Sequence, residues 1–183
     1  GNAGNLTVSA RDIEIIGGEN VNDLFAEGLN IIELRELDKK GNFTGLFVDT
    51  DATGNGGDLT VKAESLMLRD GAQISAATLG QGNAGNLTVF ARSLTLQDKA
   101  EISATAFASN SQGFVGNNLR NSSPNATQNA AGNLEINSNN IRLEDQARLT
   151  AETKAGDEGS ITINNNKDLI LRDNSKITTN ATG

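Results

Sequence analysis

An aspartate recurs at one position of a repeated pattern, and its carboxylates are the groups in this chain best suited to metal or acid–base chemistry. The recurring residues are Asp70, Asp98, Asp145 and Asp173, in the strings LRDGA, LQDKA, LEDQA and LRDNS. Clustered carboxylates can bind Ca²⁺, and with a basic residue they can act on acidic polysaccharides. Each Asp stands at a turn, however, where its side chain most simply accepts backbone N–H groups. We therefore predict a structural ladder of Asp residues, with no metal site and no catalytic residue.

The composition removes most other catalytic chemistry. The chain contains no His and no Cys, so it lacks the commonest general base and the thiolates that hold zinc. Tyr and Trp are absent and Phe occurs six times, which leaves few aromatic platforms for sugars. The formal net charge of −8 argues against nucleic acid and anionic membranes as partners, because both are negatively charged. No apolar run approaches the roughly 18 residues that span a membrane, and we predict neither a cofactor nor an enzymatic site.

Five similar strings, each preceded by Gly, define the repeat unit that must position these side chains. The glycines are Gly4, Gly57, Gly85, Gly132 and Gly159. Two of the four spacings are 28 and 27 residues, and the other two, 53 and 47 residues, exceed one 28-residue unit by 25 and 19. We therefore predict a single domain over 1–183, with five coils of about 28 residues and insertions at about 17–41 and 107–131.

Three short apolar strings recur in every unit. The first reads NLTV, DLTV, NLTV, NLEI and SITI, and examples of the other two are SLTL and EISA. Each string alternates between inward and outward positions, which is the period of a β-strand, and turn residues separate the strings. This pattern predicts an all-β fold, a right-handed parallel β-helix with three short strands in each coil. The inward residues should stack in aliphatic columns, for example Leu6, Leu59, Leu87, Leu134 and Ile161, or Val8, Val61, Val89, Ile136 and Ile163.

A second ladder is predicted at the corner before the first string. Its members are Asn5, Asp58, Asn86, Asn133 and Ser160. Asn side chains at equivalent positions of stacked strands can bond to one another along the stack. The Gly before each of them permits a tight bend or a positive φ. We therefore expect a structural role for these polar residues.

Two insertions break the repeat. The first contains IIELREL followed by DKKGN, which predicts a protruding hairpin, with a short amphipathic helix as the alternative. The second holds the only Pro and predicts a polar loop. Insertions in repeat proteins often lie on the binding face, so Phe25, Phe107 and Phe114 are candidate contacts to a partner. A neutral decoration, tolerated at low entropic cost, is the simpler interpretation.

The repeat strings themselves resemble a known family. The unit GNGGDLTVKAESLMLRDGAQISAATLGQGNAGNLTV, together with FTGLFVDTDATGNGGDLTV, is similar to the repeat region of cyanobacterial filamentous-haemagglutinin-like exoproteins. The resemblance implies a large β-helical passenger of two-partner secretion, exported through an outer-membrane secretion barrel and folding outside the cell. It also implies adhesion to a surface receptor or a glycan. The family's amino-terminal secretion domain is not visible here, so no functional residue is carried over.

These observations predict a non-enzymatic structural or adhesive segment of a secreted or cell-surface exoprotein. Both ends of the chain fall in the repeat register, so we expect flanking β-helix coils of the same protein on both sides. Two alternatives stay open. One is a carbohydrate-active β-helix, in which acids near an insertion act with Ca²⁺, and the other is the carrier stalk of a secreted toxin.

Overall fold

The computed structural model describes residues 1–18, 44–50, 54–78, 82–106, 129–153 and 156–181. Within these ranges the chain is all β, and it contains no helix with the length and apolar character needed to cross a membrane. The strands are β1 (Leu6–Ser9), β2 (Asp12–Ile16), β3 (Gly45–Phe47), β4 (Leu59–Arg69), β5 (Gln73–Ser75), β6 (Leu87–Leu96), β7 (Glu101–Ser103), β8 (Leu134–Leu143), β9 (Arg148–Thr153), β10 (Ile161–Leu171) and β11 (Lys176–Ala181).

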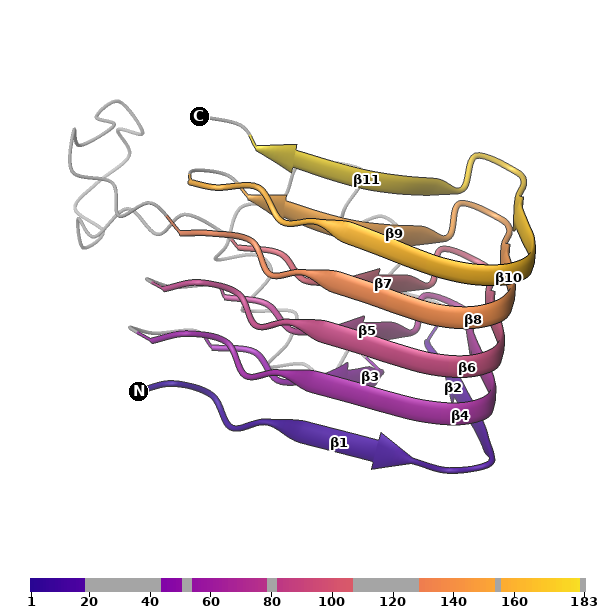
Figure 1. The fold of residues 1–183 in the computed structure, drawn as a ribbon, viewed down its shortest axis with the longest axis horizontal. Coiled ribbons are helices and arrows are strands. Elements are labelled where there is room, and N and C mark those ends of the chain that lie inside the picture. The colour runs from indigo at the N-terminus through magenta and orange to yellow at the C-terminus, as the bar shows by residue number, and fades with distance from the viewer. Residues whose placement is uncertain (19–43, 51–53, 79–81, 107–128, 154–155, 182–183) are drawn as a thin grey trace.

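The strands form two parallel sheets between which the chain alternates. Sheet A has the order β1-β4-β6-β8-β10, with β2 also paired to β4, and sheet B has the order β3-β5-β7-β9-β11. Figure 1 shows the long strands of sheet A stacked in front of the short strands of sheet B, with the N- and C-termini at opposite ends of the stack. We call one passage through sheet A and the following passage through sheet B a tier. Each tier therefore pairs with the tiers before and after it in the sequence.

The prediction of three separate strands in each unit is wrong for most tiers. The first two apolar strings lie in one continuous strand in β4, β6, β8 and β10, and only β1 and β2 are separate. In β4, the N–H groups of Glu64 and Ser65 both donate to the carbonyl of Arg11, over 2.8 and 3.1 Å. The pairing of β4 with β6 skips Glu64. β6 leaves out Arg92 at the equivalent position, so the register is kept and the strand continues.

Strand register confirms the predicted aliphatic columns. Leu59 pairs with Leu87 and Leu87 with Leu134, and all three side chains are fully buried. Burying one such side chain stabilises the fold by about 1.5–3 kcal/mol. The buried residues of both sheets belong to one cluster, so the core lies between the sheets. Partly buried residues complete the columns at the two ends: Leu6, Ile13, Ile15, Leu46, Ile161, Ile163 and Ile177.

The Gly before each corner Asn is required by contact between tiers. A Cβ on Gly85 would collide with the carbonyl oxygen of Gly57, and one on Gly132 would collide with that of Gly85. These glycines have no positive φ, contrary to one of the roles predicted for them. Positive φ occurs instead three residues earlier, at Gly54, Gly82 and Gly156. The repeated glycine therefore permits close stacking of backbones rather than a left-handed bend.

The ends of the predicted insertions belong to the stack. Gly17 N–H donates to the carbonyl of Arg69 over 2.9 Å, as the next member of the β2–β4 ladder. Ala131 N–H donates to the carbonyl of Asp157 over 3.0 Å, and Ala130 accepts from Ala84 over the same distance. The stack therefore resumes before residue 131, where the second insertion was predicted to end. The predicted hairpin or helix of the first insertion, and Phe25, Phe107 and Phe114, lie outside the described residues.

Val89→Asp tests the column assignment. Val89 is fully buried and pairs with Val61 and Ile136, so an unpaired carboxylate at this position should cost about 3 kcal/mol or more. We expect urea denaturation to show a lost or strongly weakened cooperative transition. Phe90→Asp places the same charge on the exposed neighbouring residue and should keep the transition. A Val89→Asp protein as stable as the wild type would contradict a closed core.

Candidate functional site

The corner residues form a continuous ladder of side-chain to backbone hydrogen bonds. Asn5 Oδ1 accepts the N–H of Asp58, Asp58 Oδ1 accepts that of Asn86, and Asn86 Oδ1 accepts that of Asn133, over 2.9, 2.9 and 3.1 Å. Asn133 Oδ1 accepts from both N–H and Oγ of Ser160, over 3.2 and 2.7 Å. The Nδ2 groups of Asn86 and Asn133 also donate to the preceding tier. The amides of Asn86 and Asn133 therefore bond to both the preceding and the next tier.

A second ladder runs beside the first and was missed by sequence reasoning. Asn2 Oδ1 accepts the N–H of Asn55, Asn55 Oδ1 that of Asn83, and Asn83 Oδ1 that of Ala130, over 2.9, 3.0 and 2.9 Å. The strings GNAGN and GNGGD carry the signal, because an Asn stands three residues before Asn5, Asp58 and Asn86. Both ladders use the side-chain carbonyl as acceptor, and both are structural.

The four aspartates lie in tight turns that end the long strands of sheet A. Asp70, Asp98, Asp145 and Asp173 have φ of 58°, 51°, 52° and 52°, and the residue after each also has positive φ. Ala100 N–H donates to the carbonyl of Gln97 over 3.1 Å, which closes one such turn. Two successive positive φ values are typical of a type I′ turn, in which Asp, Asn and Gly are preferred.

The Asp side chains do not make the turn bond that was predicted. In the described part of the chain no backbone N–H donates to these carboxylates; the Asp backbone carbonyls accept instead. Lys99 N–H donates to the carbonyl of Asp145, and Gln146 N–H to that of Asp173, each over 2.8 Å. The Asp residues therefore form a column through their backbones, and their preference for the left-handed region explains their recurrence.

Like charges in this column disturb one another. Loss of solvation raises the pKa of Asp145, and the charges of Asp173, Asp98 and Glu144 raise it further. Glu144 accepts a hydrogen bond from Gln97 over 3.0 Å and pairs with Arg142, and these contacts hold its pKa below the ordinary value. Within the described residues, no group of three or more acids is arranged to hold a metal ion.

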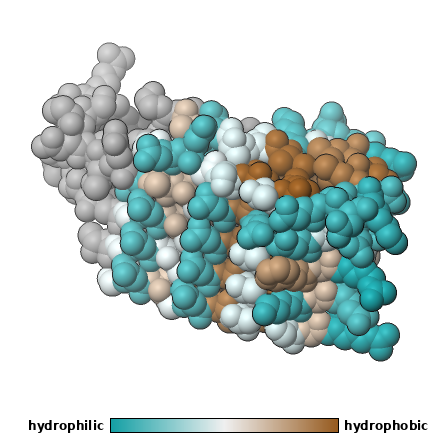
Figure 2. All heavy atoms as spheres, viewed as in Figure 1, coloured by the Kyte–Doolittle hydropathy of each residue, from teal (hydrophilic) through white to brown (hydrophobic). Residues whose placement is uncertain are grey.

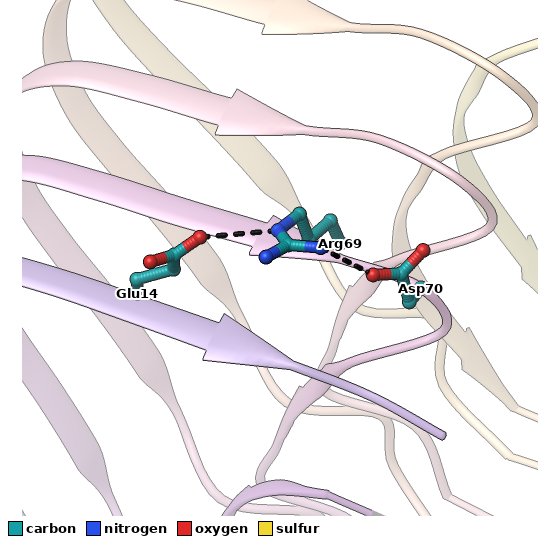
Figure 3. Close-up of polar contacts among 3 residues, drawn as sticks. All are labelled: Glu14, Arg69 and Asp70. Atoms are coloured by element: carbon teal, nitrogen blue, oxygen red, sulfur yellow. Dashed lines mark hydrogen bonds and ion pairs between the residues drawn. The ribbon is translucent and has the colours of Figure 1, made fainter. Parts of the chain in front are cut away.

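Arg69 neutralises the charge of two acids, Glu14 and Asp70, at the N-terminal end of the Asp column. Figure 3 shows Arg69 between Glu14 of β2 and Asp70, with Nε 3.0 Å from Glu14 Oε1 and Nη1 2.7 Å from Asp70 Oδ2. All three side chains are more than a third exposed, so water weakens these ion pairs. They neutralise charge between tiers rather than form a reactive centre.

The outer face of sheet B carries a polar network that sequence reasoning missed. Thr150 Oγ1 donates to Glu101 Oε1 over 2.6 Å, and Thr178 Oγ1 donates to Glu152 Oε1 over 2.7 Å. Partial burial raises the pKa of Glu101, and the charge of Glu152 raises it further, while the bond from Thr150 and the charge of Arg148 lower it. The signal was present in the outward positions of EIS and RLTAET, which place acids on one face. Two carboxylates placed on one face are one requirement of glycoside hydrolysis.

A hollow opens on the outer face of sheet A, where the long strands change direction. Its volume is about 710 Å³, and its lining includes Ser9, Lys62, Phe90 and Asn137. These four residues are consecutive members of one outward column that Asn164 continues, and we call the five residues the Phe90 column. The Phe90 side chain is 43% exposed, and Lys62 Nζ lies 5.8 Å from the centre of its ring. The hollow therefore combines an aromatic surface, a cation and amides.

Asn86→Ala tests the corner ladder. The substitution removes the acceptor of Asn133 N–H and a donor to Asp58, and we expect the free energy of unfolding to fall by about 1 kcal/mol in urea denaturation. Asn86→Asp keeps the acceptor but places a second carboxylate beside Asp58, so it should not restore the stability. Asn166→Ala removes an exposed amide that makes one long bond, 3.3 Å, and serves as the control with a smaller loss. Wild-type stability in both Asn86 variants would show that the ladder contributes nothing.

Glu101→Gln tests the polar network through the pH dependence of stability. Because folding raises the pKa of Glu101, the folded state binds the proton more tightly than the unfolded state. Stability should therefore fall as the pH rises from the ordinary Glu pKa through the raised value, and Glu101→Gln should remove this decline. The measurement is the urea midpoint between about pH 4 and pH 8.

Glu158→Gln is the matched control, because Glu158 is an exposed acid. It removes the same charge and should leave the decline in place. Parallel pH profiles for Glu101→Gln and the wild type would show that burial of Glu101 does not affect stability.

Comparison of the chain with protein-family models, with curated proteins and with solved structures finds no match, so its function is argued from the residues described above.

Proposed function

We propose that the chain is a segment of a right-handed parallel β-helix of five coils, and that it serves as a non-enzymatic structural and adhesive part of a secreted or cell-surface exoprotein. One observation carries the proposal: the same contacts recur from tier to tier over the whole stack. Aliphatic columns, corner glycines and the corner ladder continue across all the described tiers, and the second Asn ladder continues from Asn2 to Ala130. Repeated contacts of this kind produce an elongated stack with an extended surface, rather than one enclosed site.

The closed, right-handed coil is supported by the connections between the sheets. Each tight turn leads from sheet A to sheet B, and the corner residues lead back to the next strand of sheet A. Thr78 Oγ1 donates to the carbonyl of Asn83 over 2.8 Å, and Gly85 N–H donates to the carbonyl of Ala76 over 3.1 Å, so the returning chain is bonded to the residues that follow β5. Parallel crossover connections are right-handed in nearly all proteins.

The two ends of the stack support further coils of the same protein beyond this segment. Leu169 and Leu171 continue buried columns, yet they are 45% and 41% exposed. Figure 2 shows apolar side chains gathered at the C-terminal end of the stack, and hydrophilic side chains in stripes along it. Among the described residues, the outer edges of β1 and β10 have no strand partner, which favours pairing with another strand. Flanking coils would cover the apolar residues and pair these edges.

Location and partners are proposed from the repeat strings. Their resemblance to filamentous-haemagglutinin-like exoproteins supports export through an outer-membrane secretion barrel, folding outside the cell, and contact with a surface receptor or a glycan. The described stack offers such a partner long, regular outer faces, because every second residue of each strand points away from the core.

A carbohydrate-active β-helix is the second candidate, and the network of Glu101 and Glu152 favours it. The network places two carboxylates beside Arg148 on the outer face of sheet B. Against it, Glu101 and Glu152 already accept hydrogen bonds from Thr150 and Thr178, so they hold the sheet together. We therefore keep the non-enzymatic function as the proposal.

The proposed function predicts adhesion by the folded protein alone. Beads coated with the protein should retain cyanobacterial cells under flow, and beads coated with Val89→Asp should not, because the binding faces exist only in the folded stack. The measurement is the fraction of cells retained. Retention no greater than on uncoated beads, with a protein shown to be folded, would refute the adhesive role.

The enzymatic alternative has a separate test. Polygalacturonate and alginate are incubated with the protein, with and without Ca²⁺, and we expect no product. Turnover that is lost in Asp98→Ala or Glu101→Gln would overturn the non-enzymatic function.

A further inference from the structure

We propose that the Phe90 column binds one strand of an acidic glycan rich in uronic acids, lying along the axis of the stack. The inference rests on the proposed adhesive function and names a ligand and a site for it. The site is the hollow of sheet A, and it lies wholly within described residues.

The centre of the hollow places an apolar surface beside a cation. The ring of Phe90 is 43% exposed in the middle of a strand, where its neighbours in the column are Lys62 and Asn137. Lys62 Nζ lies 5.8 Å from the ring centre, and Lys62 makes no ion pair with an acid of the described chain. The C–H face of a pyranose ring can pack on Phe90 while its carboxylate pairs with Lys62. A uronic acid carries both groups on one ring.

Two cations beside the hollow can contact an anionic ligand, although the whole protein is acidic. Lys62 lines the hollow, and Arg92 follows Phe90 by two residues on the exposed bend of β6. Arg11 also lines the hollow, but its Nε lies 3.9 Å from Glu64 Oε2 and 3.7 Å from Asp12 Oδ2, so its charge is balanced. Because the hollow is open to solvent, Lys62 and Arg92 act mainly through direct contact with the ligand.

The C-terminal half of the column is suited to hydroxyl groups. Asn164 Nδ2 donates to Asn137 Oδ1 over 2.9 Å, and both amides donate to Glu135 Oε1, over 3.2 Å from Asn137 and 3.4 Å from Asn164. An amide retains donor and acceptor capacity beyond these bonds, and sugar hydroxyls can use it. Glu135 is the acid nearest this half, so we place the carboxylate-binding position at Lys62 and hydroxyl contacts at Asn137 and Asn164.

The spacing of the column distinguishes a glycan from a peptide. Each tier contributes one side chain, and adjacent parallel strands lie about 4.8 Å apart. One pyranose ring of an extended glycan is close to this length, so successive rings can meet successive side chains. An extended peptide rises only about 3.3 Å per residue and drifts out of register with the tiers. The five members of the column therefore fit a short run of sugar rings.

The test measures binding of oligogalacturonates of increasing length by calorimetry. Affinity should rise with length and level off near the length of the column. Lys62→Met and Phe90→Ala should each weaken binding about tenfold or more, because one removes a charge-assisted contact and the other the stacking surface. Neutral cello-oligosaccharides of equal length should bind more weakly, and Lys62→Met should not change their affinity.

Matched controls come from the opposite sheet. Phe47 is 38% exposed and Lys176 is exposed, so Phe47→Ala and Lys176→Met remove the same groups elsewhere and should bind like the wild type. Equal binding by Lys62→Met, Phe90→Ala and the wild type would refute the site. Tighter binding of poly-glutamate than of oligogalacturonate would show that the ligand is an acidic peptide and would overturn the proposal.

The binding experiment and the adhesion experiment can fail independently of each other. If coated beads retain cells and the two variants bind oligogalacturonate normally, adhesion stands and this site fails. If oligogalacturonate binds at the Phe90 column and the beads retain no cells, the site stands and the adhesive role fails.

Discussion

Parallel backbone pairing between tiers is the constraint on which the rest of the structure depends. It fixes the separation of equivalent residues at about 4.8 Å, so every side chain lies next to its own counterpart in the neighbouring tiers. A residue type is acceptable only if it packs on or bonds to its counterparts. Leu and Ile pack on their counterparts in the buried columns. The side chain of a corner Asn donates one hydrogen bond and accepts another along the stack. The corner Gly has no Cβ that would collide with the backbone of the neighbouring tier. The repeated letters follow from this self-compatibility.

Charged residues satisfy the same constraint least well. In the Asp column the carboxylates of adjacent tiers raise the pKa of Asp145. Elsewhere opposite charges meet between adjacent tiers. Glu14 pairs with Arg69 of the next tier, and the register of sheet B sets Glu101 beside Arg148. The same column then places Arg148 beside Lys176, so the register does not keep all like charges apart.

Sequence reasoning was effective wherever a position is governed by stacking. The inward columns and the corner residues were found because period-two alternation and an unvarying unit determine them. The sequence did not predict where a strand continues or ends when that depends on the geometry within one repeat unit. The strand continues through Lys62, Ala63 and Glu64 because the next tier leaves out the equivalent residue and the register is kept, whereas the residue types between the two apolar strings suggested a turn. The network of Glu101 and Thr150 spans 49 residues, so only the stacked structure brings its members together.

The ladder bonds also bear on how such a chain can fold. Where no insertion intervenes, they join residues 27 or 28 positions apart, whatever the total length of the stack. The loop that must close is therefore the same for each added tier, and its entropic cost does not grow as the rod lengthens. Each completed tier presents the template for the next one. The chain can therefore fold one tier at a time, because no tier requires the rest of the rod to be present before it closes.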